Sequence, residues 1–345
     1  MIYQCTQKYE SANKAKIGVL ITNLGTPDLP EKKSLKIYLK EFLSDTRVVE
    51  PPPARFIWKA ILNLIILNTR PKKSAEAYKS VWGKFGKGSP LLDISNKQSQ
   101  LVDQNLNNKK ASLFQVELGM RYGNPSISSA LKKLEKKGCE KIIVLPLYPQ
   151  YASATTGSTF DAVTDEIKTW RRVPELRFID HYHEEEGYIS ALANSVKNFQ
   201  EKHAKPDLLI MSYHGIPRRY FDNGDNYPCH CCKTSFLLSQ KLGIDSSKYK
   251  MTFQSRFGRE EWIKEYTDET LKLLPKKGIK NVQIICPGFS ADCLETIEEI
   301  EEENREYFMD SGGEKYQYIP ALNDANDHIN FICELIKKKT KDWVE

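Results

Sequence analysis

The chain carries the same series of landmarks twice, and this internal repeat constrains its fold more than any other feature. Residues 17–27 (IGVLITNLGTP) and 207–217 (DLLIMSYHGIP) are each an apolar run closed by a Gly-x-Pro turn. Two further pairs follow in the same order: ELGMRYG at 117–123 with TFQSRFG at 252–258, and KKGCEKIIVLPLYPQY at 136–151 with KKGIKNVQIICPGFSA at 276–291. Matched landmarks in one order predict two structurally related halves.

The segments between the landmarks are amphipathic. SISSALKKLEKKG at 126–138 and TDETLKLLPKKG at 267–278 predict helices that end near Gly138 and Gly278. Fully apolar strands that alternate with such helices are typical of parallel sheets covered by helices. We therefore expect each half to be a doubly wound α/β unit, in which ligands bind beyond the C-terminal ends of the strands.

The repeat divides the chain into a polar lead-in at 1–15, a first half at 16–170 and a second half at 171–345, whose C-terminal helix packs back on the body. Segment 51–71 (PPPARFIWKAILNLIILNTRP) stands outside the repeat and is apolar on nearly every side. Two interpretations of this segment are open. It is either a buried core helix, or an apolar flap over a large hydrophobic ligand or a lipid surface.

Composition excludes several classes of protein. The 345 residues include 51 Lys and Arg against 45 Asp and Glu, and this excess of +6 is too scattered to predict nucleic-acid binding. No run of 18 apolar residues predicts a membrane span, and the polar N-terminus lacks the apolar core of a signal peptide. Eight cysteines in a chain of this length are then expected to be reduced thiols in the cytoplasm.

Two groups of residues are candidates for chemistry. His214 follows an apolar strand and precedes a Gly-x-Pro turn, where side chains face a cleft, although a lone histidine is often structural. In the acidic stretch 288–308, Asp292, Glu295 and Glu299 recur at i, i+3 and i+7, which predicts one face of a helix. Such a face is either solvated or a column of carboxylates that passes cations or protons into the cleft.

Aromatic residues gather in the same predicted cleft. They are Tyr122, Tyr148, Tyr151, Tyr213, Phe257 and Trp262, with Arg121 and Arg256 beside them. Flat apolar walls with cations at the rim suit a large, planar, anionic ligand. A porphyrin fits this description because its macrocycle is apolar and its propionates are charged.

These motifs resemble those of the ferrochelatases, the terminal enzymes of haem synthesis. NLGTP, GSPL, RYGNP, PLYPQY, TTGS, SYHGIP, FQSRFG, TDE and CPGFSADCLETIEEI appear in the family's order from about Ile17 to the C-terminus. The resemblance implies two similar Rossmann-like domains around a porphyrin cleft. It also implies a lyase that inserts ferrous iron, as a substrate, into protoporphyrin IX without a required cofactor.

The resemblance also implies roles for individual residues. His214 is expected to accept protons, contact the metal or both, and Glu295 to face it as the second metal contact. Glu299 and Asp292 are expected to act as a relay. Tyr122, Tyr148, Tyr151 and Trp262 are assigned to porphyrin binding, together with Arg121. Segment 55–68 resembles the family's apolar lip, which favours the flap and a peripheral contact with the membrane.

Two departures from the family bear on the metal path and on the substrate. Cys293 stands where many members have a histidine, so the metal path either uses a thiol there or bypasses this position. Asp28 stands where the coproporphyrin-using branch has a tyrosine, which favours protoporphyrin. The alternatives are a chelatase for another metal or tetrapyrrole, such as coproporphyrin III or sirohydrochlorin, and a non-catalytic tetrapyrrole-binding protein.

A last motif, YPCHCCKTS at 227–235, places Cys229, Cys231 and Cys232 within four positions. Thiolates hold iron too tightly for an ion that is to be handed over, so this motif is not expected to be the catalytic site. Two interpretations are open: a 2Fe–2S cluster with Cys139 as its fourth ligand, since some ferrochelatases carry such a cluster, or thiols without a metal. The sequence does not predict the oligomeric state.

Overall fold

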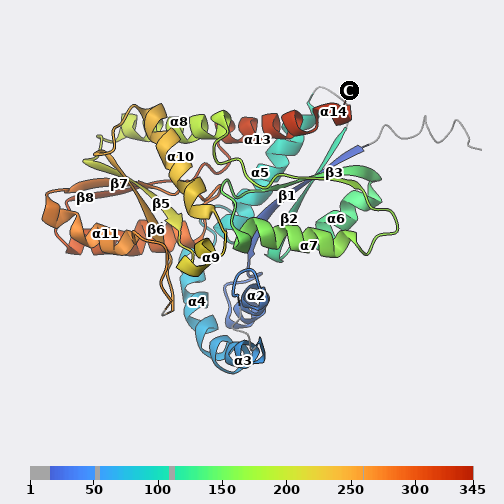
Figure 1. Cartoon of the computed structure of the whole chain (residues 1–345), viewed down its shortest axis with the longest axis horizontal. Coiled ribbons are helices and arrows are strands. Elements are labelled where there is room, and N and C mark those ends of the chain that lie inside the picture. Colours follow the sequence, from blue (N-terminus) through green and yellow to red (C-terminus); the bar gives the residue numbers. More distant parts are fainter. Residues whose placement is uncertain (1–15, 51–54, 109–112, 259, 345) are drawn as a thin grey trace, which may run out of the picture.

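The computed structural model of the chain describes residues 16–50, 55–108, 113–258 and 260–344. The predicted lead-in at 1–15 and the prolines that open segment 51–71 lie outside the described residues. Figure 1 shows the described chain as two sheets side by side, with helices around them. A smaller helical arm projects from one side of this body.

The two sheets repeat one another. The first contains β1 (Lys16–Thr26), β2 (Phe114–Gly123), β3 (Cys139–Pro146) and β4 (Glu175–Phe178), and the second contains β5 (Leu208–His214), β6 (Tyr249–Gln254), β7 (Asn281–Ile285) and β8 (Lys315–Ile319). Their orders are β2-β1-β3-β4 and β6-β5-β7-β8, and every pairing is parallel. The prediction of two related parallel α/β halves is therefore confirmed.

Helices connect the strands. In the first half they are α2 (Lys32–Ser44), α3 (Arg55–Ile61), η1 (Leu62–Ile66), α4 (Leu67–Val81), α5 (Pro90–Asn107), α6 (Ile127–Lys136), η2 (Ser153–Gly157) and α7 (Ser158–Ile167). In the second half they are α8 (Glu186–Lys202), α9 (Arg218–Asp222), α10 (Tyr227–Leu242), α11 (Thr267–Leu273), η3 (Pro275–Lys277), η4 (Glu295–Glu303), α12 (Asn304–Asp310), α13 (Asn326–Lys339) and α14 (Lys341–Val344).

One large core joins the halves. Alternate residues of a strand point to opposite faces of its sheet, and in β1 Val19 enters this central core while Leu20 enters a separate cluster under α6 and α7. Met211 of β5 also belongs to the central core, whereas the neighbouring Ile210 packs in a cluster on the far side of the second sheet. The inner faces of both sheets thus contribute to one apolar interior.

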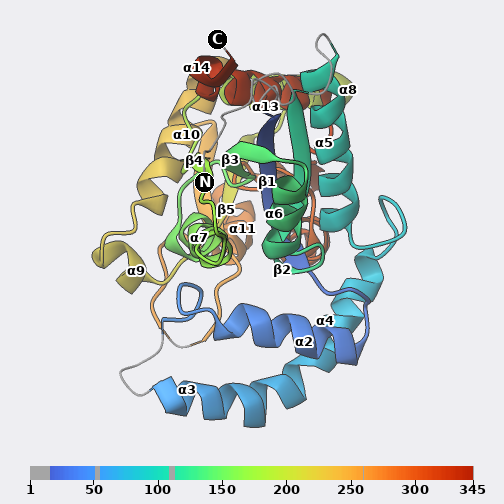
Figure 2. The ribbon, with the colours of Figure 1, turned by 90° about the vertical axis from the view of Figure 1, so that its right-hand side faces the viewer.

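The arm consists of α2, α3, η1 and α4, and Figure 2 shows α2 and α3 lying below the sheets. Leu62 and Leu67 are buried against α2. On the outer side, Phe56, Leu64 and Ile65 are 74%, 73% and 57% exposed. The interpretation of segment 51–71 as a buried core helix is therefore wrong, because most of its described apolar side chains face away from the body.

The C-terminal helices return to the first half. Helix α13 runs beside α5 and α8. Arg177 of β4 binds Asp342 of α14 through two hydrogen bonds of 2.6 Å, and its guanidinium lies 4.2 Å from the ring centroid of Trp343. These contacts fasten the end of the second half to the edge strand of the first.

Candidate functional site

His214 is the last residue of β5, at the C-terminal edge of the second sheet. Its Nδ1 lies 2.7 Å from the backbone oxygen of Gly215. A carbonyl oxygen only accepts hydrogen bonds, so Nδ1 carries the proton and Nε2 of the neutral ring has a free lone pair. His214 is therefore held in the tautomer that suits a base or a metal ligand.

Gln254 links this histidine to the acidic helix. It ends β6 and pairs in register with His214. Its side-chain amide donates to the backbone oxygen of Glu295 at 3.2 Å, and its Oε1 accepts from Ser212 at 2.8 Å. One buried amide thus fixes the start of η4 against the end of β5, which brings His214 and Glu295 to the same edge of the sheet.

The acidic helix η4 is a π-helix that spans Glu295–Glu303. Its i→i+5 hydrogen bonds are rare in proteins and frequent at functional sites. Asp292 precedes the helix, so the prediction that Asp292, Glu295 and Glu299 share one helical face is wrong. The motif that follows the strand contains an irregular turn before the helix starts, and residue spacing alone does not reveal it.

Asp292 has a structural environment. It is 1% exposed and accepts hydrogen bonds from Tyr318 at 2.6 Å, Asn323 Nδ2 at 2.6 Å and Thr296 at 3.0 Å. The Ala321 amide also donates to it, at 3.3 Å. Its lone pairs are occupied by these donors, so it fixes the loop before η4.

Glu299 is half-buried in η4 and is suited to proton transfer. Ser255 donates to it twice, from its backbone amide at 2.7 Å and from its hydroxyl. Ser255 has a φ of 65°, a conformation that is uncommon for residues other than glycine and that clusters at functional sites. Burial raises the pKa of Glu299 to about 7, against the effect of the hydrogen bonds from Ser255.

A small cavity of about 10 Å³ lies beside Glu295. It is lined by Leu24, Gly25, Thr26, Tyr38, Tyr78, Ser89, Pro90, Leu91, Cys293, Leu294 and Glu295. Its volume suits about one water molecule. Because the lining comes from both halves, Glu295 lies at the boundary between them.

Cys293 lines this cavity and is 5% exposed. Burial raises the pKa of its thiol well above the ordinary value, and the charge of Glu295 adds to the effect. A thiol that stays protonated at neutral pH is a poor metal ligand, because the thiolate is the ligating form. Of the two routes left open for the metal path, this environment favours the one that bypasses Cys293.

Trp262 packs near His214, with ring centroids 6.4 Å apart. Phe257 meets Trp262 edge to face at 4.9 Å, and the guanidinium of Arg70 in α4 lies 5.5 Å from the Phe257 ring. Trp262 is 5% exposed and Phe257 47% exposed. A series of contacts therefore runs from the arm to the catalytic candidate His214.

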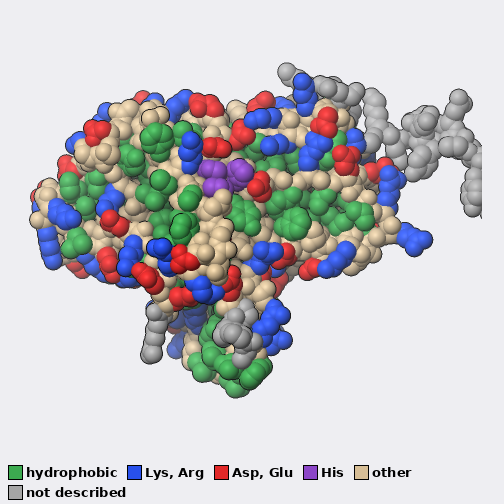
Figure 3. All heavy atoms as spheres, viewed as in Figure 1, with side chains coloured by type: hydrophobic (Ala, Val, Ile, Leu, Met, Phe, Trp, Pro, Cys, Tyr) green, Lys and Arg blue, Asp and Glu red, His purple; other side chains and the backbone are tan. Residues whose placement is uncertain are grey.

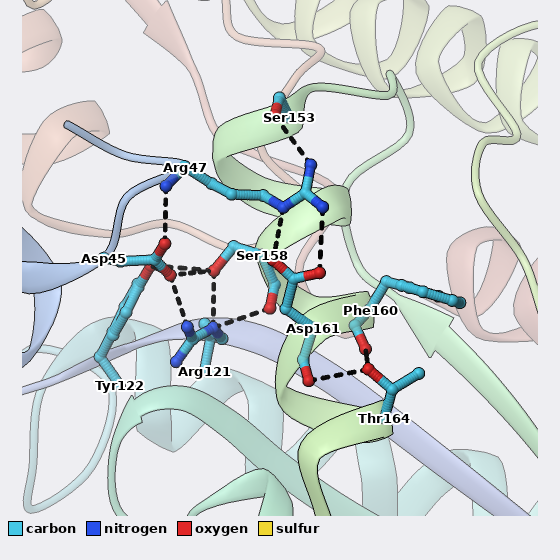
Figure 4. Close-up of polar contacts among 9 residues, drawn as sticks. All are labelled: Asp45, Arg47, Arg121, Tyr122, Ser153, Ser158, Phe160, Asp161 and Thr164. Carbon is cyan, nitrogen blue, oxygen red and sulfur yellow. Dashed lines mark hydrogen bonds and ion pairs between the residues drawn. The ribbon is translucent and has the colours of Figure 1, made fainter. Parts of the chain in front are cut away.

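Arg121 and Tyr122 belong to a polar network at the end of β2, shown in Figure 4. The hydroxyl of Tyr122 donates to Asp45 at 2.8 Å, and Arg121 pairs with the same carboxylate and donates to Ser158 Oγ at 2.6 Å. Burial works against the charge of Asp45, but the hydrogen bonds, led by that from Ser158, lower its pKa. Tyr122 has no exposed surface and therefore offers no face to a ligand in this structure.

Arg121 lines an open hollow of about 620 Å³ together with Ile37, Lys40, Glu41, Ser44 and Asp45. Tyr148 is half-buried, and its hydroxyl has no hydrogen-bond partner within the described chain. Tyr151 is also half-buried, in the loop after β3. Arg121, Tyr148 and Tyr151 thus remain partly accessible near the strand ends of the first half.

The four cysteines predicted as cluster ligands do not meet. Cys231 is fully buried in the central core, Cys229 and Cys232 are exposed on α10, and Cys139 packs under α6. Across residues 16–50, 55–108, 113–258 and 260–344, no group of three His, Cys, Asp or Glu side chains is placed to hold a metal ion. A helix directs neighbouring residues to different sides, so Cys231 points away from Cys229 and Cys232. The 2Fe–2S cluster stays a prediction.

Gln254 and Ser255 were not predicted from the sequence. Both lie in the FQSRFG landmark, directly where β6 ends. The strand-end rule that selected His214 points to this position as well. Tyr38 and Tyr78, which line the cavity at Glu295, carry no comparable signal because they belong to helices outside the repeat.

The fold defines a class of protein. The structure is similar to SirB from Bacillus subtilis with Fe3+, with a TM-score of 0.52, 10% identity and coverage of 96% of this chain and 98% of that one. The sirohydrochlorin chelatase SirB from Bacillus subtilis subspecies spizizenii in complex with cobalt gives the same TM-score, at 10% identity over 94% and 96% of the two chains. The chain has the fold of a chelatase.

Sequence comparison identifies the family within this class. The family model for ferrochelatase matches residues 16–340. The ferrochelatase of Hydrogenovibrio crunogenus is 61% identical over 345 residues, which cover 100% of this chain and 91% of the relative. That of Alcanivorax borkumensis is 52% identical over 344 residues, with 100% of both chains covered. The chain belongs to the ferrochelatase family.

Proposed function

We propose that this chain inserts ferrous iron into protoporphyrin IX to form protohaem, the last step of haem synthesis. The observation that carries this proposal is the junction at the strand end, where Gln254 joins the strand of His214 to the helix of Glu295 and Glu299. Family membership supports the reaction. Ferrous iron is the second substrate, and the chemistry requires no further cofactor.

The reaction requires the protein to remove protons from the porphyrin and to bend its macrocycle. A base must take two protons from the pyrrole nitrogens, and the flat macrocycle must be bent so that its lone pairs meet the iron. We assign the first proton transfer to Nε2 of His214, which has a free lone pair. Glu295 faces the ring as the second metal contact, and Glu299 passes protons onward because its pKa of about 7 allows gain and loss near neutral pH.

The porphyrin site is assigned to the apolar surface around Trp262 and to the first-half residues Arg121, Tyr148 and Tyr151. Trp262 is held by an edge-to-face contact with Phe257 and by a backbone bridge to Pro217 in the turn after His214. A fixed aromatic wall lets binding energy be used to bend the macrocycle. Tyr122 is fully buried and supports Arg121, whose guanidinium lies 4.5 Å from the centroid of the Tyr122 ring.

The decisive experiment mixes purified protein with ferrous iron and protoporphyrin IX under anaerobic conditions and follows the haem absorption spectrum. We expect His214→Ala and Glu295→Gln to lower the insertion rate at least 100-fold, on the order of the effect of a general acid or base. His203→Ala and Glu334→Gln change exposed side chains elsewhere and serve as matched controls. Insertion into sirohydrochlorin alone, or unchanged rates in the two site variants, would contradict the proposal.

We propose protoporphyrin rather than coproporphyrin III as the substrate. Asp28 follows the first Gly-x-Pro turn and accepts a hydrogen bond from Asn124 at 3.0 Å, near the end of β2. A carboxylate at this rim disfavours the two additional carboxylates of coproporphyrin. Competition between the two porphyrins in the insertion assay tests this, and a preference for coproporphyrin III by the wild-type protein would reverse the assignment.

We also propose that segment 55–68 touches the membrane surface from the cytoplasmic side. Its exposed apolar residues are flanked by Arg55 and Lys59, and Figure 3 shows apolar side chains gathered on the projecting arm. Within the described ranges, none of the helices has both the length and the apolar character needed to cross a bilayer. Apolar side chains with adjacent cations are typical of interfacial attachment to anionic lipid.

Flotation with vesicles that contain phosphatidylglycerol tests this contact. We expect Leu64→Glu to reduce the bound fraction strongly, because a carboxylate enters the apolar surface. Val173→Glu, at an exposed apolar residue outside the arm, is the control. Equal vesicle binding of the wild-type protein and Leu64→Glu would show that the arm does not contact the membrane.

A further inference from the structure

Two exposed cysteines open helix α10. The helix begins at Tyr227, and Cys229 and Cys232 lie three residues apart near its start. Both side chains are exposed, whereas Cys231 between them is fully buried in the central core. The three cysteines of the motif are therefore an accessible Cys-x-x-Cys pair and one core residue.

The geometry of a helix places this pair side by side. Residues three apart have Cβ atoms separated by about 5–6 Å on the same side of a helix. A disulfide requires a Cβ separation of about 3.5–4.5 Å, so a small adjustment of the first turn brings the two sulfur atoms together. The adjustment falls at the start of α10, where the amides of Cys229 and His230 both donate to the backbone oxygen of Asn226, at 2.9 and 3.2 Å.

The surroundings favour redox chemistry over metal binding. Cys231 points away, and the remaining neighbour His230 has both ring nitrogens engaged: Nδ1 accepts from the backbone amide of Tyr151 at 3.2 Å, and Nε2 lies 3.1 Å from Asn226 Nδ2. The part of the chain that the structure describes contains no third ligand that converges on the pair. Two adjacent thiols without a third ligand are suited to forming a disulfide with each other.

We propose that Cys229 and Cys232 form a reversible disulfide, so that the start of α10 is a thiol–disulfide exchange site. With a small-molecule disulfide as the oxidant, the thiolate of one cysteine attacks it and releases one small thiol. The second cysteine then displaces the other small thiol from the mixed disulfide. Two protein thiols lose two electrons and two protons, and the oxidant gains both as two thiols.

The site lies on the seam between the halves. The ring of His230 stacks on His183 with centroids 3.8 Å apart and an angle of 11°, and His181 lies 5.1 Å from both rings. Figure 3 shows histidine side chains gathered in the middle of this face. His230 lies between the two cysteines in the sequence, and its Nδ1 accepts a hydrogen bond from the backbone amide of Tyr151 in the first half. Closure of the disulfide would therefore shift His230 and alter this hydrogen bond.

The test uses the full-length Cys5→Ser variant, which removes the cysteine that lies outside the described residues. The protein is exposed to oxidised glutathione, its free thiols are alkylated, and peptides are mapped by mass spectrometry. We expect a peptide with Cys229 and Cys232 both unalkylated and two hydrogens lighter, and full reversal by a dithiol. The insertion rate should differ between the oxidised and reduced forms.

Two further variants decide the outcome. With Cys232→Ser, we expect a mixed glutathione adduct at Cys229 that persists, because the resolving thiol is absent, and an insertion rate that no longer depends on disulfide closure. Cys231→Ala leaves the pair intact and should still close the bond. Stable glutathione adducts on both cysteines of the Cys5→Ser protein would contradict the proposed disulfide. A closed disulfide with an unchanged insertion rate would contradict the coupling of the disulfide to Tyr151.

Discussion

Gln254 donates its side-chain amide to the backbone oxygen of Glu295 at 3.2 Å, across the boundary between a strand and a π-helix. The same side chain accepts from Ser212 in the strand that ends with His214. The relative position of the two main catalytic candidates therefore depends on a residue that contributes no charge. An uncharged amide suits this place because it holds both segments without changing the electrostatics of the site.

Replacing Gln254 by alanine should slow insertion by roughly 10- to 100-fold, because small displacements of catalytic groups have effects of this size. The free energy of unfolding should fall by about 1–3 kcal/mol, since buried polar groups lose a partner. Gln283→Ala removes another buried strand glutamine that binds Gln200 and Gln317, and it should lower stability while preserving the rate. Equal loss of rate in both variants would mean that Gln254 acts through stability alone.

The pH dependence of the free energy of unfolding should reflect the ionisation of Glu299. Because its pKa of about 7 lies above the ordinary value, the folded protein binds more protons than the unfolded chain between about pH 4.5 and 7, and stability falls as pH rises through this range. Glu299→Gln should therefore raise the free energy of unfolding at pH 8 by about 3 kcal/mol, following 1.36 kcal/mol per pKa unit. The same variant should insert iron slowly, and loss of both stability and activity would argue against a proton-transfer role.

Ser255→Ala offers a separate measurement on the same carboxyl. The hydroxyl of Ser255 stabilises the charged form of Glu299, so its removal should raise the pKa further. We expect the rising limb of the rate–pH profile to move to higher pH, with the rate recovering in alkaline buffer. Ser247→Ala, at an exposed serine bound to Asp245, should leave the profile in place.

His183 should make the protein sensitive to acid. Burial lowers the pKa of its imidazole to about 3, with contributions from His230, His181 and Lys233, while Asp180 opposes the effect. A histidine with a lowered pKa contributes stability that is complete above about pH 6.5 and is lost as the pH falls toward 3. Between pH 7.5 and 5 we expect a loss of about 2 kcal/mol from this group, at 1.36 kcal/mol per pKa unit.

Denaturant unfolding at these two pH values measures that loss. His183→Phe preserves the stacked ring on His230 and should reduce the difference between the two pH values. His203→Phe is the control at an exposed histidine that contacts Phe199. A pH dependence that is the same in the wild-type protein and His183→Phe would show that other groups cause it.

The pair formed by Asp45 and Arg121 should be important for stability. The side chains are 7% and 18% exposed, and Tyr122 and Ser158 donate to the same carboxylate. Asp45→Ala leaves the guanidinium without its partner, which costs about 3–5 kcal/mol for a buried pair. Asp161→Ala removes the partner of Arg47 at a site that is 42% exposed, where a loss below about 1 kcal/mol is expected. Thermal unfolding compares the two variants.

The sequence predicted the fold because the repeat and the apolar strands are encoded locally. The rule that ligands bind at strand ends selected His214 and the segment that contains Glu295, and the structure links these two places through Gln254. The environment of Asp292 was not predictable, since its four donors come from Thr296 and from residues 318–323. Spacing along one segment cannot reveal partners that the tertiary fold supplies.

The cysteines illustrate the same limit. Their proximity in sequence is real, but helical geometry sends Cys231 into the core and leaves Cys229 and Cys232 on the surface. The arm was ambiguous for a related reason. A continuous apolar segment is compatible with burial or exposure, and the contacts of Leu62 and Leu67 show that only part of it has protein to pack against.

The shared core has a mechanical consequence. Residues of both sheets, such as Val19 and Met211, pack in a single cluster, so separating the halves like a hinge would expose much of the interior to water. The two halves are therefore one rigid body, although the chain repeats the same series of landmarks. The arm lies outside this rigid body, since its cation–π contact with the second half, between Arg70 and Phe257, involves no residue of the central cluster.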